Sequence, residues 1–308
     1  MAWGTNGILA IALGQVVFLY CTATNKTQEI RACFEPNNYV TSVAWRSGAN
    51  QLAVGTFQAE LQLWDIDRCA KLRSLRSHRA RIGSLAWSSS DTLASGSLDA
   101  KILLNDVRAS RYVVGVLAHH TEEVCGLAWS PDGNTLASGS NDNQLCLWNS
   151  VTMPRCSNRG HGAAVRALTW SPWERHLLAS GGGAADGAIK LWSSLNGQLL
   201  RSVATGSQVC ALAWSNTTRE LVSAHGHHSA ANTVTLWEYP SMTRVCDLTG
   251  HTARVLHLAI SPNGMSMASA GADETLRFWD VFPSSRSSWM SPNPGKSGRF
   301  DLHSAVIR

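Results

Sequence analysis

The feature that most constrains the fold is an internal repeat, with a period of 41 to 46 residues, that runs through nearly the whole chain. The unit is clearest in residues 120–149, where three short runs with strand character (124–129, 135–138 and 144–148) are separated by two stretches rich in turn-forming residues. A large apolar residue ends the first run of every unit. These residues are Trp3, Trp45, Trp87, Trp129, Trp170, Trp214 and Ile260, at successive intervals of 42, 42, 42, 41, 44 and 46 residues. The chain is therefore an array of similar supersecondary units.

A second anchor ends the third run of each unit, at Tyr20, Trp64, Asn105, Trp148, Trp192, Trp237 and Trp279. Gly-His pairs precede the first run of some units, as at Gly160-His161, and Trp-Asp pairs close others, as at Trp64-Asp65. A period in the low forties with these pairs is typical of WD-repeat propellers. We therefore predict an all-β, seven-bladed WD-repeat β-propeller that spans residues 1–282.

The two ends of the chain depart from this regular pattern. The first unit begins at once with Trp3, whereas such rings usually close with an N-terminal strand that forms the outer strand of the last blade. We therefore expect the last blade to lack its outer closing strand and to present an exposed edge. Residues 283–308 are rich in Pro, Ser and Gly at first and end in Ile-Arg, which predicts a flexible C-terminal tail.

Composition excludes several classes of protein. The eight cysteines include no CxxC pair and several lie in expected strands, so we interpret them as reduced residues of an intracellular protein rather than disulfides or a zinc site. Residues 7–21 are apolar, but no Lys or Arg precedes them and the run is too short to cross a membrane, so we expect two strands there and no membrane partner. A net charge of +5 without a basic stripe gives no reason to expect nucleic acid.

Sets of His, Ser and Asp recur at matching places in three units, and the sequence offers no better candidate for catalysis. A hydrolase would need one such set beside an oxyanion hole, so repetition favours a buried hydrogen-bond network and predicts no enzyme. We expect neither metal nor cofactor: residues 225–228 carry three histidines but suit a solvated loop, and residues 181–183 lack the Lys of a phosphate loop. The three sets are His120, Ser138 and Asp142; His161, Ser180 and Asp186; and His251, Ser269 and Asp273.

Several stretches go beyond a generic propeller, because they extend into loops as well as strands. They are YVTSVAW (39–45), LAVGT (52–56), ELQLWD (60–65), ARIGSLAW (80–87), EVCGLAW (123–129), SNDN (140–143), QVCALAW (208–214), HTARV (251–255), ADETLRFW (272–279) and the final Ile307-Arg308. Through these stretches the chain resembles the Fizzy family of coactivators of the anaphase-promoting complex, or cyclosome, in all seven units and the tail.

The resemblance implies a site on the top face of the propeller for the Lys-Glu-Asn degron. The matching positions here are Asn141, Asn143, Gln208 and Arg254, of which Arg254 suits the degron's carboxylate. One position departs from the family pattern, because Ala184 stands where relatives have a Thr and therefore offers no hydroxyl contact.

The resemblance also implies a groove between the first and last blades for the destruction box, an Arg-x-x-Leu peptide. Glu274 matches an acidic residue that faces the Arg, and Ile11 matches the wall of the Leu pocket. A second acidic residue of the family lies in the closing strand that we expect this chain to lack.

The third implied site is the C-terminal pair Ile307-Arg308, which in relatives docks in a groove of the ligase's helical-repeat scaffold subunit. The family's disordered N-terminal arm, which activates the ligase, is also expected to be missing. The expected function is a non-enzymatic adaptor that presents degron-bearing cell-cycle substrates to the anaphase-promoting complex for ubiquitin-dependent degradation, in the nucleus and cytoplasm. The alternative is an interaction scaffold or inactive decoy that has lost ligase activation.

Overall fold

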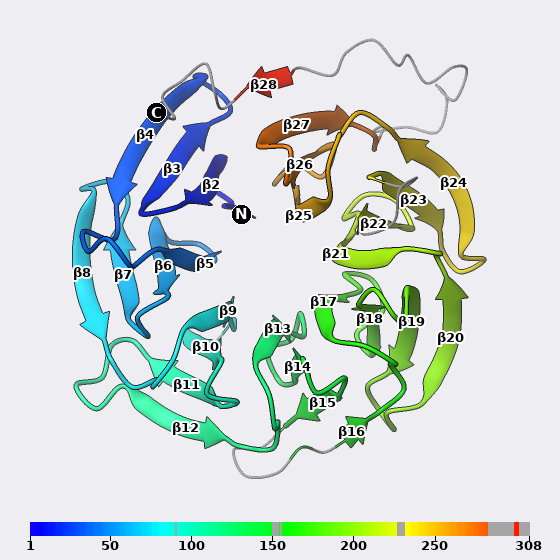
Figure 1. Ribbon diagram of the computed structural model, residues 1–308, viewed down its shortest axis with the longest axis horizontal. Helices are drawn as coiled ribbons and strands as arrows, with labels where there is room; N and C mark the ends of the chain where they lie inside the picture. Colours follow the sequence, from blue (N-terminus) through cyan, green and yellow to red (C-terminus); the bar gives the residue numbers. More distant parts are fainter. Residues whose placement is uncertain (90, 150–153, 155, 227–231, 283–298, 302–308) are drawn as a thin grey trace.

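The chain forms a ring of seven four-stranded antiparallel sheets around a central channel, as Figure 1 shows. The computed structural model describes residues 1–89, 91–149, 154, 156–226, 232–282 and 299–301. Each sheet is one blade, and its strands follow one another in chain order from the channel outward. The prediction of an all-β, seven-bladed propeller is confirmed.

The strand bounds repeat with the sequence period. From blade one to blade seven they are β1 (Ala2–Trp3), β2 (Ile8–Leu13), β3 (Val16–Cys21), β4 (Lys26–Arg31); β5 (Val40–Trp45), β6 (Gln51–Thr56), β7 (Leu61–Asp65), β8 (Ala70–Leu75); β9 (Ile82–Trp87), β10 (Thr92–Ser97), β11 (Ile102–Asp106), β12 (Val113–Leu117); β13 (Val124–Trp129), β14 (Leu136–Ser140), β15 (Leu145–Trp148), β16 (Cys156–Asn158); β17 (Val165–Trp170), β18 (Leu177–Gly182), β19 (Ala188–Ser193), β20 (Leu199–Ala204); β21 (Gln208–Trp214), β22 (Glu220–Gly226), β23 (Val234–Glu238), β24 (Thr243–Leu248); β25 (Val255–Ile260), β26 (Ser266–Gly271), β27 (Thr275–Asp280) and β28 (Arg299–Asp301).

The hydrophobic core lies between neighbouring blades rather than inside any one of them. The second strand is the most buried: every residue of β18 is buried, whereas its blade's outer strand β20 is almost wholly exposed. Between blades four and five, for example, Leu145 and Leu147 pack with Trp170 and Trp192. Each such side chain contributes about 1.5–3 kcal/mol of stability through burial. Because every blade buries its faces against a neighbour on each side, the stability of each blade depends on the closed ring.

In blades two to five the first repeated Trp ties the blade to the one before it. Its indole Nε1 donates to a backbone carbonyl of the preceding inner strand, which explains why this position recurs. The bonds are Trp45 to Ala2 O (3.1 Å), Trp87 to Ala44 O (3.2 Å), Trp129 to Ala86 O (3.2 Å) and Trp170 to Ala128 O (3.0 Å).

The last blade corrects one expectation, because it has four strands and not three. Strand β28 pairs with β27, with Leu276 opposite Phe300, and in Figure 1 it lies outside β27 as the red arrow. The sequence argument expected an upstream strand at this position and gave the tail between residues 281 and 300 only as the alternative. An unpaired strand edge is a template for any extended segment, and here residues after the propeller supply it.

The apolar run near the start of the chain forms β2 and β3, the second and third strands of blade one, as predicted. Among the described residues no helix is long and apolar enough to span a membrane. The seven cysteines with described side chains are free thiols, and burial raises the pKa of Cys125 to about 12.

Candidate functional site

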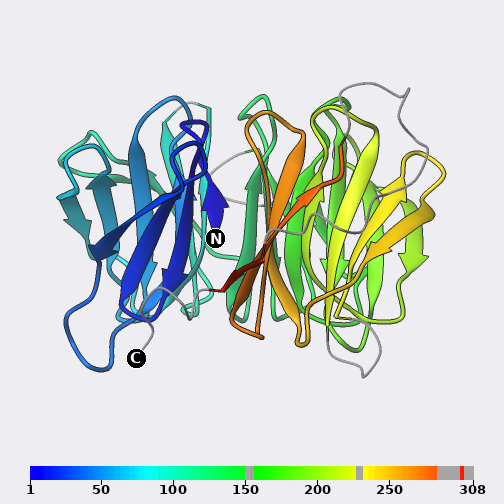
Figure 2. The same cartoon turned by 90° about the horizontal axis from the view of Figure 1, so that it is seen from above.

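Four of the predicted site residues lie on one rim of the propeller. In every blade the inner strand begins where the second strand ends, as the pairing of Val255 with Gly271 shows for blade seven. We call this end of the blades the entry rim and the opposite end the exit rim; Figure 2 shows the loops of both. Asn141 and Asn143 lie in the β14–β15 turn, Gln208 begins β21, and Arg254 precedes β25. The entry rim thus brings them together from blades four, six and seven.

The turn that carries Asn141 and Asn143 is fixed by its backbone. The N–H of Asn141 donates to Glu123 O (2.9 Å), and the N–H of Asn143 donates to Ser140 O (3.2 Å). Asn143 has a φ of 65°, a left-handed conformation that Asn tolerates better than most residues. Asn141 is exposed and Asn143 half-buried. Both side-chain amides are therefore presented from a backbone that hydrogen bonds hold in place.

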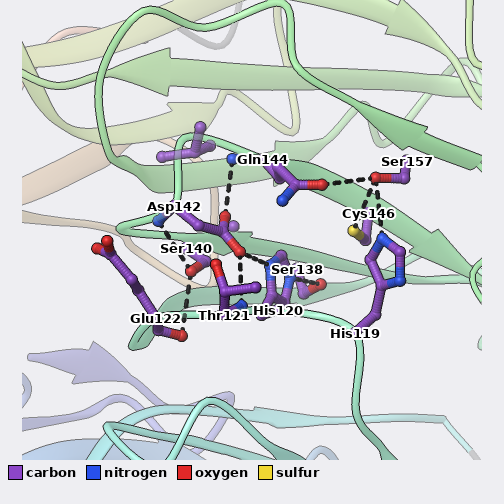
Figure 3. A network of polar contacts seen from close by, with 12 residues as sticks. His119, His120, Thr121, Glu122, Ser138, Ser140, Asp142, Gln144, Cys146 and Ser157 are labelled. Carbon is purple, nitrogen blue, oxygen red and sulfur yellow. Dashed lines mark hydrogen bonds and ion pairs between the residues drawn. The ribbon is translucent and has the colours of Figure 1, made fainter.

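Asp142, between the two asparagines, fixes this turn through the hydrogen bonds of its carboxylate (Figure 3). Its carboxylate accepts hydrogen bonds from the N–H groups of Thr121 (3.0 Å) and Gln144 (2.9 Å) and lies 2.9 Å from His120 Nδ1. Burial raises the pKa of Asp142, but the hydrogen bonds from Thr121, Gln144 and His120 outweigh it, so this pKa lies below its ordinary value. The ionised carboxylate in turn places the His120 proton on Nδ1.

The His, Ser and Asp sets are structural networks that end on the second repeated Trp. In blade four, His120 Nε2 accepts from the Ser138 hydroxyl (2.8 Å), which accepts from Trp148 Nε1 (2.8 Å). The same bonds recur in blade five (His161, Ser180, Asp186, Trp192) and blade seven (His251, Ser269, Asp273, Trp279). Burial lowers the pKa of all three histidines and keeps them neutral. The prediction that these sets form buried hydrogen-bond networks is confirmed.

Arg254 is held at the entry rim by blade six as well as by its own blade. Its carbonyl accepts from Ala272 N–H (2.7 Å), and its side chain is exposed. Gly226, which pairs with Gln208, lies directly against it: a Cβ at Gly226 would stand 2.4 Å from Arg254 Cγ and 2.5 Å from its Cβ. This glycine leaves the space that Arg254 occupies. Ala184, in the β18–β19 turn of the same rim, is half-buried.

A repeating backbone hydrogen bond organises the entry rim in five of the seven blades. In five blades the N–H of the residue that follows the second strand donates to the carbonyl of the residue that precedes the inner strand. The donor–acceptor pairs are Phe57–Tyr39 (2.9 Å), Leu98–Arg81 (3.0 Å), Asn141–Glu123 (2.9 Å), Gly183–Ala164 (2.9 Å) and Ala272–Arg254 (2.7 Å). Asn141 at the donor position and Arg254 at the acceptor position therefore each have counterparts in other blades with the same backbone bond and different side chains.

Sequence reasoning missed an ion pair at two of these positions. Arg81 Nε and Nη2 lie 2.8 Å and 2.5 Å from the two carboxylate oxygens of Glu123, which is only 6% exposed. The hydrogen bond to Glu123 is the main reason that the pKa of Arg81 is raised. This bidentate pair joins blades three and four beside Asn141. Comparing the residue before every inner strand would have drawn attention to it.

The two residues predicted for the destruction box lie at the seam between the first and last blades. Glu274 is exposed in the β26–β27 turn, whereas Ile11, on β2, is only 4% exposed and packs with Leu9, Tyr20 and Leu276. Both line the central channel, a cavity of about 450 Å³. The structure brings them to one cavity, and their role in binding stays a prediction.

Two other predictions meet the limits of the described residues. Ile307 and Arg308 lie outside them. Of the histidines expected in a solvated loop, only His225 is described, and there the expectation is wrong: it is 3% exposed and its Nε2 lies 2.6 Å from Ser223 Oγ. His225 takes the place of the loop histidine in the blade-six network, because Trp237 Nε1 donates to the same hydroxyl. No group of three or more metal-binding side chains occurs in the part of the chain that the structure describes.

Comparison with known proteins gives one consistent result. The family model of the CDC20/Fizzy WD40 domain matches residues 1–279. The chain is 47% identical over 284 residues to the anaphase-promoting complex subunit cdc20 of Dictyostelium discoideum, covering 91% of this chain and 56% of that protein. It is 46% identical over 288 residues to cell division cycle 20.1, cofactor of APC complex, of Arabidopsis thaliana, covering 91% and 62%.

A solved structure is similar over nearly the same range. A chain in a crystal structure of the mitotic checkpoint complex matches with a TM-score of 0.88 at 36% identity, covering 92% of this chain and 86% of that one. The chain spans 56% and 62% of the two sequence relatives, which is less than two thirds of their length.

Proposed function

Because the chain belongs to the CDC20/Fizzy family, we propose that it is a non-enzymatic adaptor that brings degron-bearing cell-cycle proteins to the anaphase-promoting complex. The names of its relatives support this, since one is called a subunit of that complex and another a cofactor of it. We expect this role in the nucleus and cytoplasm, which a fluorescent fusion of the protein at its native level would test.

The observation that carries the proposal is that four polar residues lie on the entry rim, namely Asn141, Asn143, Gln208 and Arg254. Arg254 supplies a guanidinium, which suits the glutamate of a Lys-Glu-Asn degron. Asn141 and Asn143 each offer an amide that both donates and accepts, which suits the degron's asparagine. Because hydrogen bonds fix the backbone of both segments, little conformational entropy is lost when a peptide binds.

The central test is binding of a Lys-Glu-Asn peptide to the purified protein. Arg254→Ala should weaken binding by a charge-assisted contact of about 1.5–3 kcal/mol, or roughly ten- to a hundredfold. Arg175→Ala is the matched control, because Arg175 is also exposed but lies in the β17–β18 loop at the exit rim. Equal affinities of the wild type and Arg254→Ala, at unchanged melting temperature, would remove Arg254 from the site.

The destruction box is the second proposed ligand. Glu274 would face its arginine and Ile11 would help to form the pocket for its leucine, both at the seam where β28 completes the last blade. Glu274→Gln should weaken destruction-box binding and leave Lys-Glu-Asn binding unchanged. If Glu274→Gln instead weakens Lys-Glu-Asn binding and leaves destruction-box binding unchanged, Glu274 does not belong to the destruction-box site.

The third proposed contact is between the C-terminal pair and the helical-repeat scaffold subunit of the ligase. Deleting Ile307 and Arg308 should abolish capture of the purified ligase while both peptides still bind. If the intact chain binds peptides but captures no ligase, the alternative of a scaffold or decoy is favoured instead.

A further inference from the structure

The central channel is lined by two layers of side chains. In blades two to seven the inner strand, which faces the channel in Figure 1, carries a buried Val or Ile at its entry-rim end, such as Val165 in blade five. The first and third residues after it share one face of the strand, and both line the channel cavity. The first residues form an entry layer of Thr41, Gly83, Cys125, Arg166, Cys210 and Leu256. The third residues form an apolar layer below it, of Val43, Leu85, Leu127, Leu168, Leu212 and Leu258.

Arg166 is the one charged residue of the entry layer. Its side chain is exposed, and it faces a cavity of about 450 Å³ rather than the outer surface of the ring. The structure gives its guanidinium no ion pair within 4.0 Å and no hydrogen bond with any residue that it describes. The N–H donors of this guanidinium are therefore available to a ligand inside the channel.

The neighbours of Arg166 in the channel do not neutralise its charge. Burial raises the pKa of Cys125 to about 12 and also raises the pKa of Cys210, and this effect outweighs the opposite effect of Arg166 on both. Both side chains are therefore neutral thiols at pH 7, and the Cys125 thiol donates to Val165 O (3.2 Å). Among the described residues that line the cavity only Glu274 is acidic, and it lies in the β26–β27 turn of blade seven, more than 4.0 Å from the guanidinium.

The two layers together define what the cavity can bind. Arg166 and Leu168 lie on the same face of β17, about 6.6–6.8 Å apart along the strand. A guanidinium binds a carboxylate through two parallel hydrogen bonds, and the leucines below it suit an apolar body. Because Arg166 offers a single positive charge and Glu274 adds a carboxylate to the same cavity, a second negative charge on the ligand would have no partner. The cavity therefore favours an organic anion with one charge.

We propose that the channel binds a small organic monocarboxylate, whose carboxylate pairs with Arg166 and whose apolar body packs on the apolar layer. This site is separate from the proposed Lys-Glu-Asn site, because Asn141, Asn143, Gln208 and Arg254 do not line the cavity. Its ligand is a small molecule and not a peptide, so the site can exist whether or not the adaptor function is correct.

The test is a titration of the full chain with benzoate, followed by NMR. Benzoate should bind about tenfold or more tightly than benzyl alcohol, which lacks the charge, and than acetate, which lacks the ring. Arg166→Met should weaken benzoate binding by about tenfold or more, Arg166→Lys should restore part of it, and Arg166→Glu should favour benzylamine instead. The methyl resonances of Leu168 should shift during the titration, whereas those of Leu200, 56% exposed on the outer strand β20, should not.

Two further variants show whether benzoate simply binds any exposed arginine. Arg175→Met at the exit rim and Arg254→Ala at the entry rim should both leave the benzoate affinity unchanged. Equal benzoate affinities of the wild type and Arg166→Met, or a titration that shifts no methyl of the apolar layer, would refute the site. Tighter binding of phenyl phosphate than of benzoate would overturn the assignment to monocarboxylates. If Arg166→Met lowers the melting temperature, Arg166→Lys and the exchange of benzoate for benzylamine in Arg166→Glu decide the question.

Discussion

Replacing Gly226 with alanine tests whether the fold, and not the arginine alone, makes the proposed degron site. The new methyl would stand 2.4 Å from Arg254 Cγ, 2.5 Å from its Cβ and 2.7 Å from its Cα, all closer than real Cβ contacts come. A flexible side chain can swing its Cγ away, but the Cα belongs to the backbone of blade seven. The substitution must therefore both displace the guanidinium and strain the boundary between blades six and seven.

Each effect has its own expected size. Overpacking of a well-packed contact costs about 1–3 kcal/mol, so the melting temperature should fall by several degrees. Displacing the guanidinium should remove most of its charge-assisted contact, which weakens Lys-Glu-Asn binding by roughly ten- to a hundredfold. Arg254→Ala alone should give the same loss of affinity without the loss of stability, because the Arg254 side chain is exposed.

The double variant decides between positioning and direct contact. If Gly226 acts only by placing Arg254, then Gly226→Ala adds no further loss of affinity once Arg254 is alanine. Calorimetry and peptide titration of the four proteins measure both quantities. If Gly226→Ala binds the peptide with wild-type affinity, the reasoning is refuted, because the displaced guanidinium would then still contact the peptide.

The remaining predictions concern stability. The histidines of the three networks have lowered pKa values, and Asp273 has a pKa of about 2. As pH falls, the unfolded chain therefore takes up more protons than the folded chain, so the stability that these groups contribute is complete above about pH 6.5 and is lost below it. A melting temperature that does not fall between pH 8 and pH 5 would contradict this. Ser269→Ala should cost about 1–3 kcal/mol in chemical denaturation, because it leaves His251 Nε2 and Trp279 Nε1 buried without their partner; a Ser202→Ala control on exposed β20 should cost nothing. Ending the chain after residue 282 should lower the melting temperature by uncovering β27, and an unchanged value would mean that β28 adds no stability.

The propeller could be predicted from the sequence because the residues that recur with each period make the hydrogen bonds that the fold requires. In blades two to five an indole reaches the preceding inner strand, as Trp129 reaches Ala86. In blades three to seven a second residue closes the blade's internal network. In blade three Asn105 fills that place, and its Nδ2 donates to Ser95 Oγ (3.2 Å). The shorter residue therefore preserves the bond that Trp148 makes in blade four, which is why one missing Trp did not break the pattern.

Contacts between distant units were harder to predict. Nothing near Arg81 in the sequence indicates that Glu123, 42 residues later, will accept both of its hydrogen bonds. The pairing of β28 with β27 was considered only as an alternative, because residues 299–301 have no strand signal of their own and become a strand only by pairing with the edge they cover. The local sequence pattern predicts the repeat units, whereas contacts with neighbouring units in the ring decide which side chains and strand edges each unit leaves exposed.

The backbone bond that recurs around the entry rim has a consequence for how such a surface changes over time. Because main-chain atoms make this bond, it does not depend on the side chain at each position, and Tyr39, Arg81, Glu123, Ala164 and Arg254 all occupy the same kind of place. At an exposed position such as Arg254 a substitution is nearly neutral for the fold and acts mainly on the proposed ligand, whereas at Arg81 or Glu123 it also breaks the ion pair between blades three and four. Lineages can therefore rewrite what the rim reads one blade at a time, while the ring beneath it stays the same.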